Sequence, residues 1–249
     1  MKRAILSLGA VVLAGGVAAC SPTPPEKTAD EAEAAREWAR PPAIAKVERA
    51  GAALAVSGVA DPGARVVLRG DNGAAFAATA DSNGHFEVRV PRQVGHVVLR
   101  PETQVGQDAA ASPDRLLILE GGEGPVAVLR PGGATRRLDA APALGAVDSD
   151  GRMRLASGRV TAETRTIEVQ NGEETVQVVP DSRGRWNVIL PPRDGPDAIR
   201  VAGREFLWPG DAGGPRDFAV ERLASGWRIR WTGPGAARQT TWLPDPAGR

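Results

Sequence analysis

Two acidic turns contain residue types at a spacing that could hold a calcium ion. Asp81 and Asn83 occur in the turn DSNG, and Asp148 and Asp150 occur in the turn DSDG. Calcium takes oxygen ligands from alternate positions of a loop in which a glycine permits a sharp turn. No glutamate follows either turn at EF-hand spacing, and a related turn at Asp181 carries an arginine at the second position. We therefore favour the alternative, in which each aspartate caps its turn by accepting backbone N–H hydrogen bonds.

Five of the six tryptophans lie in the second half of the chain, and this asymmetry raises the possibility of a binding surface there. Indole rings stack on sugars and anchor protein interfaces. Trp227, Ile229 and Trp231 alternate along a predicted strand, so we expect them in a hydrophobic core. Trp208, beside a Pro-Gly turn, and Trp242 are the remaining candidates for exposed contact residues.

Catalytic chemistry is sparsely represented. The chain has two histidines, one cysteine and no tyrosine, and it contains no HExxH, nucleophile-elbow or P-loop motif. His85 lies on the polar side of a predicted strand, where we expect it to be exposed. Carboxylates from distant loops can still form a catalytic pair. We predict a protein that is not an enzyme and has no cofactor.

The single cysteine, Cys20, directly follows an apolar segment. Lys2 and Arg3 are basic, residues 4–19 are apolar, and small residues precede the cysteine. This is the pattern of a secretory signal. The sequence VAAC at 17–20 resembles the lipobox of bacterial lipoproteins. The resemblance implies cleavage before Cys20 and attachment of several acyl chains to it, which gives a stable membrane anchor. The alternative is an ordinary signal peptide that leaves a free thiol.

The residues around this anchor bear on localisation and partners. Ser21 follows Cys20, whereas an aspartate there retains lipoproteins in the inner membrane of enteric bacteria. The resemblance therefore implies the outer membrane, on either face. The chain has 31 basic and 30 acidic residues, and removal of the signal takes away two of the basic ones. This near-neutral balance gives no reason to expect a nucleic-acid partner.

Residues 20–42 are predicted to form a tether. The sequence SPTPP at 21–25 favours an extended spacer, because proline fixes φ and lacks an N–H donor. TADE at 28–31 fits a capping box, and the alanine-rich run that follows ends at two prolines, 41–42. We expect a loosely helical segment between these points.

The stretch 57–91 recurs one hundred residues later, at 157–191. The repeat keeps a Ser-Gly pair, an Asp-Ser-x-Gly turn and an alternating apolar strand. The matching positions include Ser57 and Ser157, Gly58 and Gly158, Asp81 and Asp181, Gly84 and Gly184, Phe86 and Trp186, and Pro91 and Pro191. We predict two tandem domains, 43–143 and 144–249, each large enough to bury its own core.

Short strands and many turns predict an all-β class. Strand patterns in the first domain occur at 52–59, 64–68, 74–80, 85–90, 97–100, 116–119 and 126–129, and DPG and DNG turns separate the early ones. About seven strands in a hundred residues favour a β-sandwich. The later segments 218–221 and 227–231 match 117–120 and 126–130 more loosely.

The motif run SG-x-ADPGA-x-V, NG and AD-x-x-G-x-F-x-V resembles bacterial Ig-like domains. It is clear in the first copy and weaker in the second. The resemblance implies two tandem Ig-like β-sandwiches, each of seven strands, and a role as a spacer or adhesive module. These residues mark turns and core positions, so they imply a fold and no particular chemistry.

Three hypotheses about function follow. The first is a non-catalytic, lipid-anchored envelope protein that acts as a scaffold or a protein-interaction module. The second is a glycan-binding lipoprotein that uses tryptophans of the second domain. The third is an accessory subunit of an envelope enzyme or secretion system, recruited by strand addition at a sandwich edge.

Overall fold

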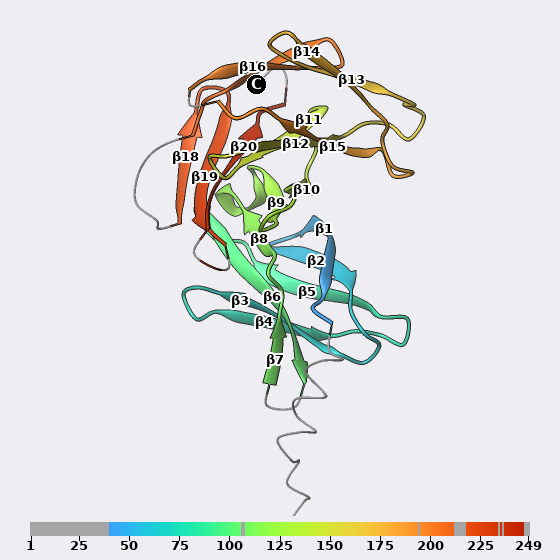
Figure 1. Cartoon of the computed structure of the whole chain (residues 1–249). Helices are drawn as coiled ribbons and strands as arrows, with labels where there is room; N and C mark the ends of the chain where they lie inside the picture. Colours follow the sequence, from blue (N-terminus) through green and yellow to red (C-terminus); the bar gives the residue numbers. More distant parts are fainter. Residues whose placement is uncertain are drawn as a thin grey trace, which may run out of the picture.

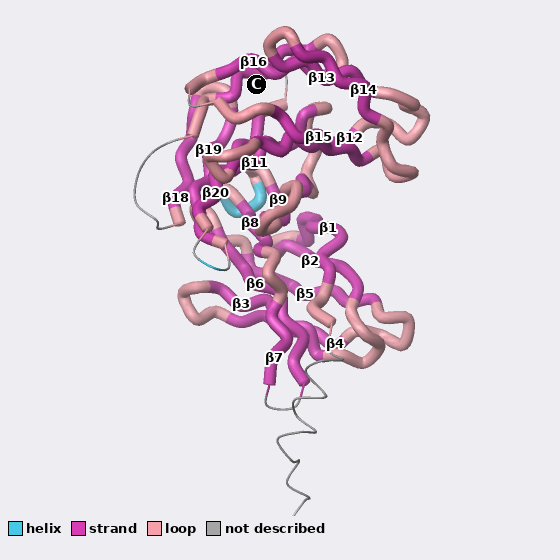
Figure 2. Tube along the Cα trace, viewed as in Figure 1, coloured by secondary structure: helices cyan, strands magenta, loops and turns pink. Residues whose placement is uncertain are grey.

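The computed structural model describes residues 40–246, except 106–107, 194, 212–217, 234 and 236. The signal segment, Cys20 and the tether up to residue 39 lie outside the described residues. The regular structure is antiparallel β-sheet, with a 3₁₀ turn at Glu120–Gly122 that appears in cyan in Figure 2. The predicted all-β class is therefore confirmed. Over the described ranges, no helix is long and apolar enough to cross a membrane.

The first ten strands form two sheets (Figure 1). Sheet A has the order β1-β2-β5, and sheet B has the order β10-β9-β8-β6-β3-β4 with β7 beside β6. The strands of sheet A are β1 (Ala43–Ala50), β2 (Ala53–Val59) and β5 (His85–Pro91). Those of sheet B are β3 (Arg65–Gly70), β4 (Ala75–Thr79), β6 (Val97–Val105), β7 (Asp108–Ala111), β8 (Arg115–Ile118), β9 (Val126–Leu129) and β10 (Arg136–Arg137).

The last ten strands form two further sheets. Sheet C has the order β15-β12-β11-β20-β19-β18, and sheet D has the order β14-β13-β16-β17. The strands of sheet C are β11 (Leu144–Ser149), β12 (Arg154–Arg159), β15 (Arg185–Leu190), β18 (Ala219–Leu223), β19 (Gly226–Thr232) and β20 (Arg238–Pro244). Those of sheet D are β13 (Ile167–Asn171), β14 (Glu174–Val178), β16 (Asp197–Val201) and β17 (Arg204–Trp208).

Three apolar layers join the four sheets in the order A, B, C, D. Sheets A and B enclose a core that includes Val56, Leu68 and Phe86, and sheets C and D enclose one that includes Trp186 and Trp208. A third cluster, which we call the inter-sandwich interface, joins sheet B to sheet C. It contains Leu117, Leu119, Ala127 and Leu129 from the first sandwich, and Ala146, Ile229, Trp231 and Leu243 from the second.

The strands at this interface are buried on both faces. Leu116 and Ile118 of β8 point into the first core, whereas Leu117 and Leu119 point toward sheet C. All four residues of β9 are likewise buried. A strand covered on both sides needs no polar alternation, which accounts for the uninterrupted apolar runs LLIL and VAVL.

Strand pairing repeats with the offset seen in the sequence. Leu54 pairs with Val90 between β2 and β5, and Arg154 pairs with Leu190 between β12 and β15. The predicted correspondence of segments 218–221 and 227–231 with segments 117–120 and 126–130 is wrong. β8 adjoins β6 in sheet B, and its counterpart beside β16 is β17, whereas β18 to β20 join sheet C beside β11. The two sandwiches therefore diverge after their seventh shared strand, β8 in the first and β17 in the second.

The Ser-Gly pair that recurs in both repeats has a packing reason. A Cβ atom on Gly58 would lie 2.1 Å from the Ala43 carbonyl oxygen, and one on Gly158 would lie 1.9 Å from that of Ala143. Each contact sits where the first strand of its sandwich changes register. The repeated motif thus preserves a close backbone approach, which only glycine permits.

Candidate functional site

The tryptophans predicted to be exposed are buried. Trp208 and Trp242 have no exposed surface and pack edge to face in the core between sheets C and D, with ring centroids 6.0 Å apart. The prediction that they are exposed contact residues is therefore wrong. Trp208 is the last residue of β17, where the alternation of the strand turns its side chain inward, so the nearby turn does not bring it to the surface. Trp186 and Trp231 are buried as predicted, although Trp231 lies in the inter-sandwich interface.

The acidic turns cap themselves. Asp81 accepts hydrogen bonds from the N–H groups of Asn83 and His85, at 2.9 and 2.8 Å. Asp150 likewise accepts from those of Arg152 and Met153. These contacts hold the pKa of both carboxyl groups below the usual range, chiefly through the backbone N–H groups. Across the described ranges, no cluster of three or more His, Cys, Asp or Glu side chains is placed to hold a metal.

The remaining calcium candidate, Asp148, is enclosed in the protein. Its Oδ2 accepts from the Thr135 N–H at 2.7 Å, and its Oδ1 accepts from the hydroxyl groups of Thr135 and Thr241, both at 2.6 Å. Burial raises the pKa of Asp148 to about 6, and these hydrogen bonds offset only part of that effect. The Trp231 indole N–H donates to Thr241 at 3.1 Å. Asp148 therefore joins Thr135 to sheet C; Thr135 lies in the segment between β9 and β11 (residues 130–143), which we call the linker.

A second polar contact fixes the join between the sandwiches. The Arg137 guanidinium, which is almost fully buried, forms a bidentate ion pair with Asp139. Its Nη1 also donates to the carbonyl oxygens of Gly145 and Pro244, both at 3.2 Å. A charge held by four acceptors tolerates burial because its hydrogen bonds replace those to water. The linker is thus fastened to the two strands of sheet C that it meets.

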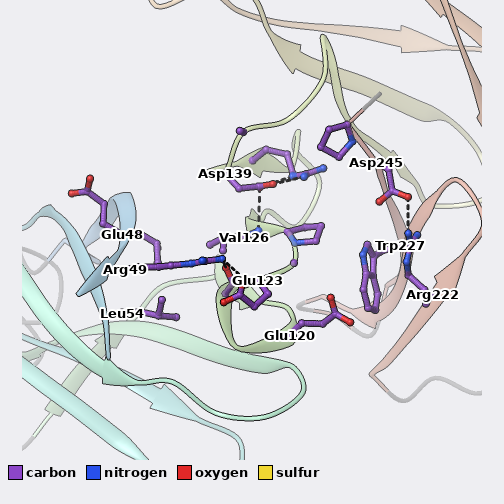
Figure 3. Close-up of a pocket in the computed structure, with 17 residues that line it drawn as sticks. Glu48, Arg49, Leu54, Glu120, Glu123, Val126, Asp139, Arg222, Trp227 and Asp245 are labelled. Atoms are coloured by element: carbon purple, nitrogen blue, oxygen red, sulfur yellow. Dashed lines mark hydrogen bonds and ion pairs between the residues drawn. The ribbon is translucent and has the colours of Figure 1, made fainter. Parts of the chain in front are cut away.

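A cleft of about 330 Å³ opens beside this join (Figure 3). We call it the junction cleft; its walls come from β1, β2, the β8–β9 turn, the linker, β18, β19 and the two residues that follow β20. Its lining includes five carboxylates and three guanidinium groups. These are Glu48, Glu120, Glu123, Asp139 and Asp245, and Arg49, Arg137 and Arg222. The volume is within the range of small-ligand pockets.

Trp227 forms one wall of the junction cleft as a fixed aromatic platform. The Arg222 guanidinium lies over one face of its ring, 5.3 Å from the centroid. Asp245 holds that guanidinium at 2.7 Å, and the carbonyl oxygens of Leu223 and Gly226 accept hydrogen bonds from it. Figure 3 shows Arg222 on one side of the ring and Glu120 on the other, across the cleft.

The opposite wall is a turn with an unusual backbone. Glu120, Gly121 and Gly122 have φ angles of 47°, 61° and 88°, which places a non-glycine residue in the left-handed region. The turn is held by its neighbours, since the Gly121 N–H donates to Gly95 O at 2.9 Å and Arg49 donates to Gly122 O at 3.0 Å. A strained residue persists only where its surroundings fix it, and such residues are frequent at binding sites.

The two glutamates of this turn differ in their partners. Arg49 and Arg92 both pair with Glu123. Burial by itself would raise the pKa of Glu123, but the two guanidinium groups outweigh it and hold that pKa below its usual range. Within the described part of the chain, no cation or hydrogen-bond donor contacts the Glu120 carboxylate.

Comparison with family models and with curated proteins finds no match to this chain.

None of the residues predicted as binding candidates lines the junction cleft. The sequence carried two signals for it. One is the run EGGEG at 120–124, whose glycines allow a left-handed turn, and the other is the position of Trp227 at the start of β19, next to an exposed Arg222. Neither could be placed without knowing that sheets B and C meet, since the two walls are about one hundred residues apart in sequence.

Proposed function

We propose that the protein is a non-catalytic, lipid-anchored component of the bacterial cell envelope that acts as a scaffold or protein-interaction module. The observation that supports this best is the stack of four sheets. An apolar layer fills each of the three spaces between successive sheets, and such close packing makes the stack stiff. Such a body can hold a partner at a set distance from a membrane. The VAAC sequence before and at Cys20 supports the anchor, and Ser21 supports the outer membrane.

Replacement of the anchor tests this proposal. We expect Cys20→Ser to move the full-length chain from the outer membrane to a soluble or inner-membrane precursor pool. A photoreactive residue at exposed Glu48, beside the junction cleft, or at exposed Ala75, on the outer strand β4, should cross-link the wild-type chain to a discrete partner in cells. An unchanged outer-membrane fraction for Cys20→Ser would refute the anchor. Absence of any adduct from either site would refute the interaction role.

The glycan-binding alternative loses the residues first assigned to it, since Trp208 and Trp242 are buried. The strand-addition alternative gains an observation. β4 is the last strand of sheet B, and its sequence, AFAAT, carries no charge and no proline. Natural sheet edges are commonly protected by such residues. An unprotected edge favours pairing with an added strand from a partner protein.

The free edge of β4 offers a regular set of backbone groups. The Gly70 N–H donates to Ala74 O at 2.8 Å, so every second residue from Ala74 faces β3. The residues between them turn their N–H and C=O groups outward: Ala75, Ala77 and Thr79. No described strand pairs with this edge.

Proline substitution separates the two edges of β4. Ala77→Pro removes an outward N–H group and should abolish strand addition while the fold is retained. Ala78→Pro removes an N–H group that serves β3, and should instead destabilise sheet B. If a partner still binds Ala77→Pro with unchanged affinity, strand addition at β4 is ruled out.

A further inference from the structure

We infer that the junction cleft binds an arginine side chain of a partner protein, with the guanidinium between the free face of Trp227 and the Glu120 carboxylate. This inference rests on the proposed role as a protein-interaction module. It names a site and a partner chemistry for that role.

The covered face of Trp227 shows the same recognition within the chain. There, Arg222 lies 5.3 Å from the ring centroid and pairs with Asp245 at 2.7 Å. The other face borders the cleft, and Glu120 points toward it (Figure 3). Both faces of one indole are thus provided with a carboxylate, but only one has a guanidinium. Stacking on an indole favours arginine, because its planar guanidinium is weakly hydrated.

The charge of the cleft favours a cation over a neutral ligand. Four of its five carboxylates are already paired with cations: Glu48 with Lys46, Glu123 with Arg49 and Arg92, Asp139 with Arg137, and Asp245 with Arg222. Among the described residues, Glu120 is the lining carboxylate that has no countercharge. A cationic group that enters the cleft therefore meets one unpaired carboxylate, that of Glu120. A saccharide can stack on Trp227 but would bring no charge to Glu120.

The geometry of Glu120 is set before any ligand arrives. Its φ of 47° is maintained by a turn that hydrogen-bonds to Gly95 and to Arg49. The Trp227 ring is also held in place, because the Arg222 guanidinium lies over one of its faces. Two walls that are already ordered lose little entropy when a ligand enters. The volume of about 330 Å³ admits an arginine side chain together with some of its backbone.

A peptide titration of the full-length chain in detergent micelles tests this inference. The probe is acetyl-Gly-Arg-Gly-amide, and its partner probe carries citrulline, which has the shape of arginine without the charge. Binding is followed by the indole ¹H–¹⁵N signals, and the signal of Trp227 is identified by its loss in Trp227→Phe. We expect the arginine peptide to shift the Trp227 signal saturably, with no shift from the citrulline peptide.

Matched variants assign the countercharge. Glu120→Gln should weaken the arginine peptide by about tenfold, as expected for loss of a carboxylate beside an aromatic cation site. Glu120→Asn should weaken the arginine peptide to a similar extent. Because asparagine tolerates a positive φ, that result would show that the loss of affinity does not come from backbone strain. Glu174→Gln, at an exposed position on β14 in sheet D, should leave the affinity unchanged. Free argininamide distinguishes a small cation from a peptide, and it should bind more weakly than the peptide.

Several results would overturn the inference. These are an absent shift of Trp227, equal binding of the citrulline peptide, full affinity in Glu120→Gln, tighter binding of free argininamide, or a shift caused by chitotriose alone. The last result would make the cleft a saccharide site. If the peptide fails while the cross-linked partner persists in cells, this inference fails and the proposed function stands. If no partner is captured in cells, the proposed function fails independently of the peptide result.

Discussion

At the scale of single residues, side chains expected to bind ligands stabilise the fold instead. Asp81 and Asp150 cap turns, and Asp148 joins the linker to sheet C through Thr135 and Thr241. Asp148 differs from the other two because it is buried, whereas Asp81 and Asp150 are exposed. Its burial makes its charged form unfavourable, and this has a measurable consequence for pH dependence.

The stability of the protein should contain a component that falls as pH rises from about 4 to about 6. The folded pKa of Asp148 is about 6, above the ordinary value of 3.8 for an aspartate, so the folded state binds more protons over this window. Stability therefore decreases with pH there, by roughly 2 to 3 kcal/mol. Urea unfolding between pH 3.5 and pH 7, in steps of about 0.5 unit, should show this decrease relative to Asp148→Asn.

Asp150→Asn is the matched control for that measurement. The pKa of Asp150 is lowered, mainly by the Met153 N–H, so its contribution is present at neutral pH and is lost as the pH falls. The stability of wild type relative to Asp150→Asn should therefore increase as the pH rises, whereas its stability relative to Asp148→Asn should decrease. Identical pH profiles for wild type and Asp148→Asn would contradict the assignment of a raised pKa.

At the scale of elements, the two sandwiches solve one packing problem in different ways. Arg154 of β12 is buried between sheets C and D, where it pairs with Asp197 at 2.9 Å and donates to Asn171 Oδ1 at 2.8 Å. In the first sandwich, Leu54 occupies the position equivalent to Arg154, and Val97 occupies the position equivalent to Asp197. A buried ion pair is seldom more stable than the apolar pair that can replace it, but half of one is strongly destabilising.

We therefore expect Asp197→Val to lower the free energy of unfolding by about 3 kcal/mol, because it leaves Arg154 buried without a countercharge. The double variant Arg154→Leu/Asp197→Val, which installs the pair of the first sandwich, should recover most of that loss. Urea denaturation of the three proteins measures both steps. A double variant as unstable as Asp197→Val would show that the two sites are not equivalent.

The strands and turns could be predicted because their signals are local. Alternation at His85–Pro91 and the Asp-x-x-Gly turns fixed the early strands and their repeat. What could not be predicted is the contact between the two sandwiches. The runs at Leu116–Leu119 and Val126–Leu129 indicate strands covered on both faces, but they do not say by what. For the same reason Trp208 and Trp242 were misplaced, since burial depends on a partner sheet distant in sequence.

At the scale of the whole molecule, the inter-sandwich interface makes two repeats into one body. Trp231 is only 2% exposed and contacts this interface, while its indole N–H continues to Thr241 and thus to Asp148. Apolar packing and a buried hydrogen-bond network therefore act at the same boundary. We therefore expect the two sandwiches to unfold in a single transition.

Truncation of Trp231 should uncouple the sandwiches. We expect Trp231→Ala to lower the free energy of unfolding by about 3 to 5 kcal/mol, because it leaves a large cavity and removes the hydrogen bond from the indole N–H to Thr241. Urea unfolding followed by circular dichroism should change from one transition to two. Leu207→Ala, at a side chain that is 59% exposed, should change neither the number of transitions nor the midpoint.

If sheets A to D form a single rigid stack, the distance between its two outermost sheets should be fixed. Spin labels at Arg89→Cys on β5 and Glu168→Cys on β13, in a Cys20→Ser background, mark the two outermost sheets at exposed positions. Double electron–electron resonance should give one narrow distance distribution, and Trp231→Ala should broaden it. A broad or multimodal distribution in the protein with Trp231 intact would contradict the single stack.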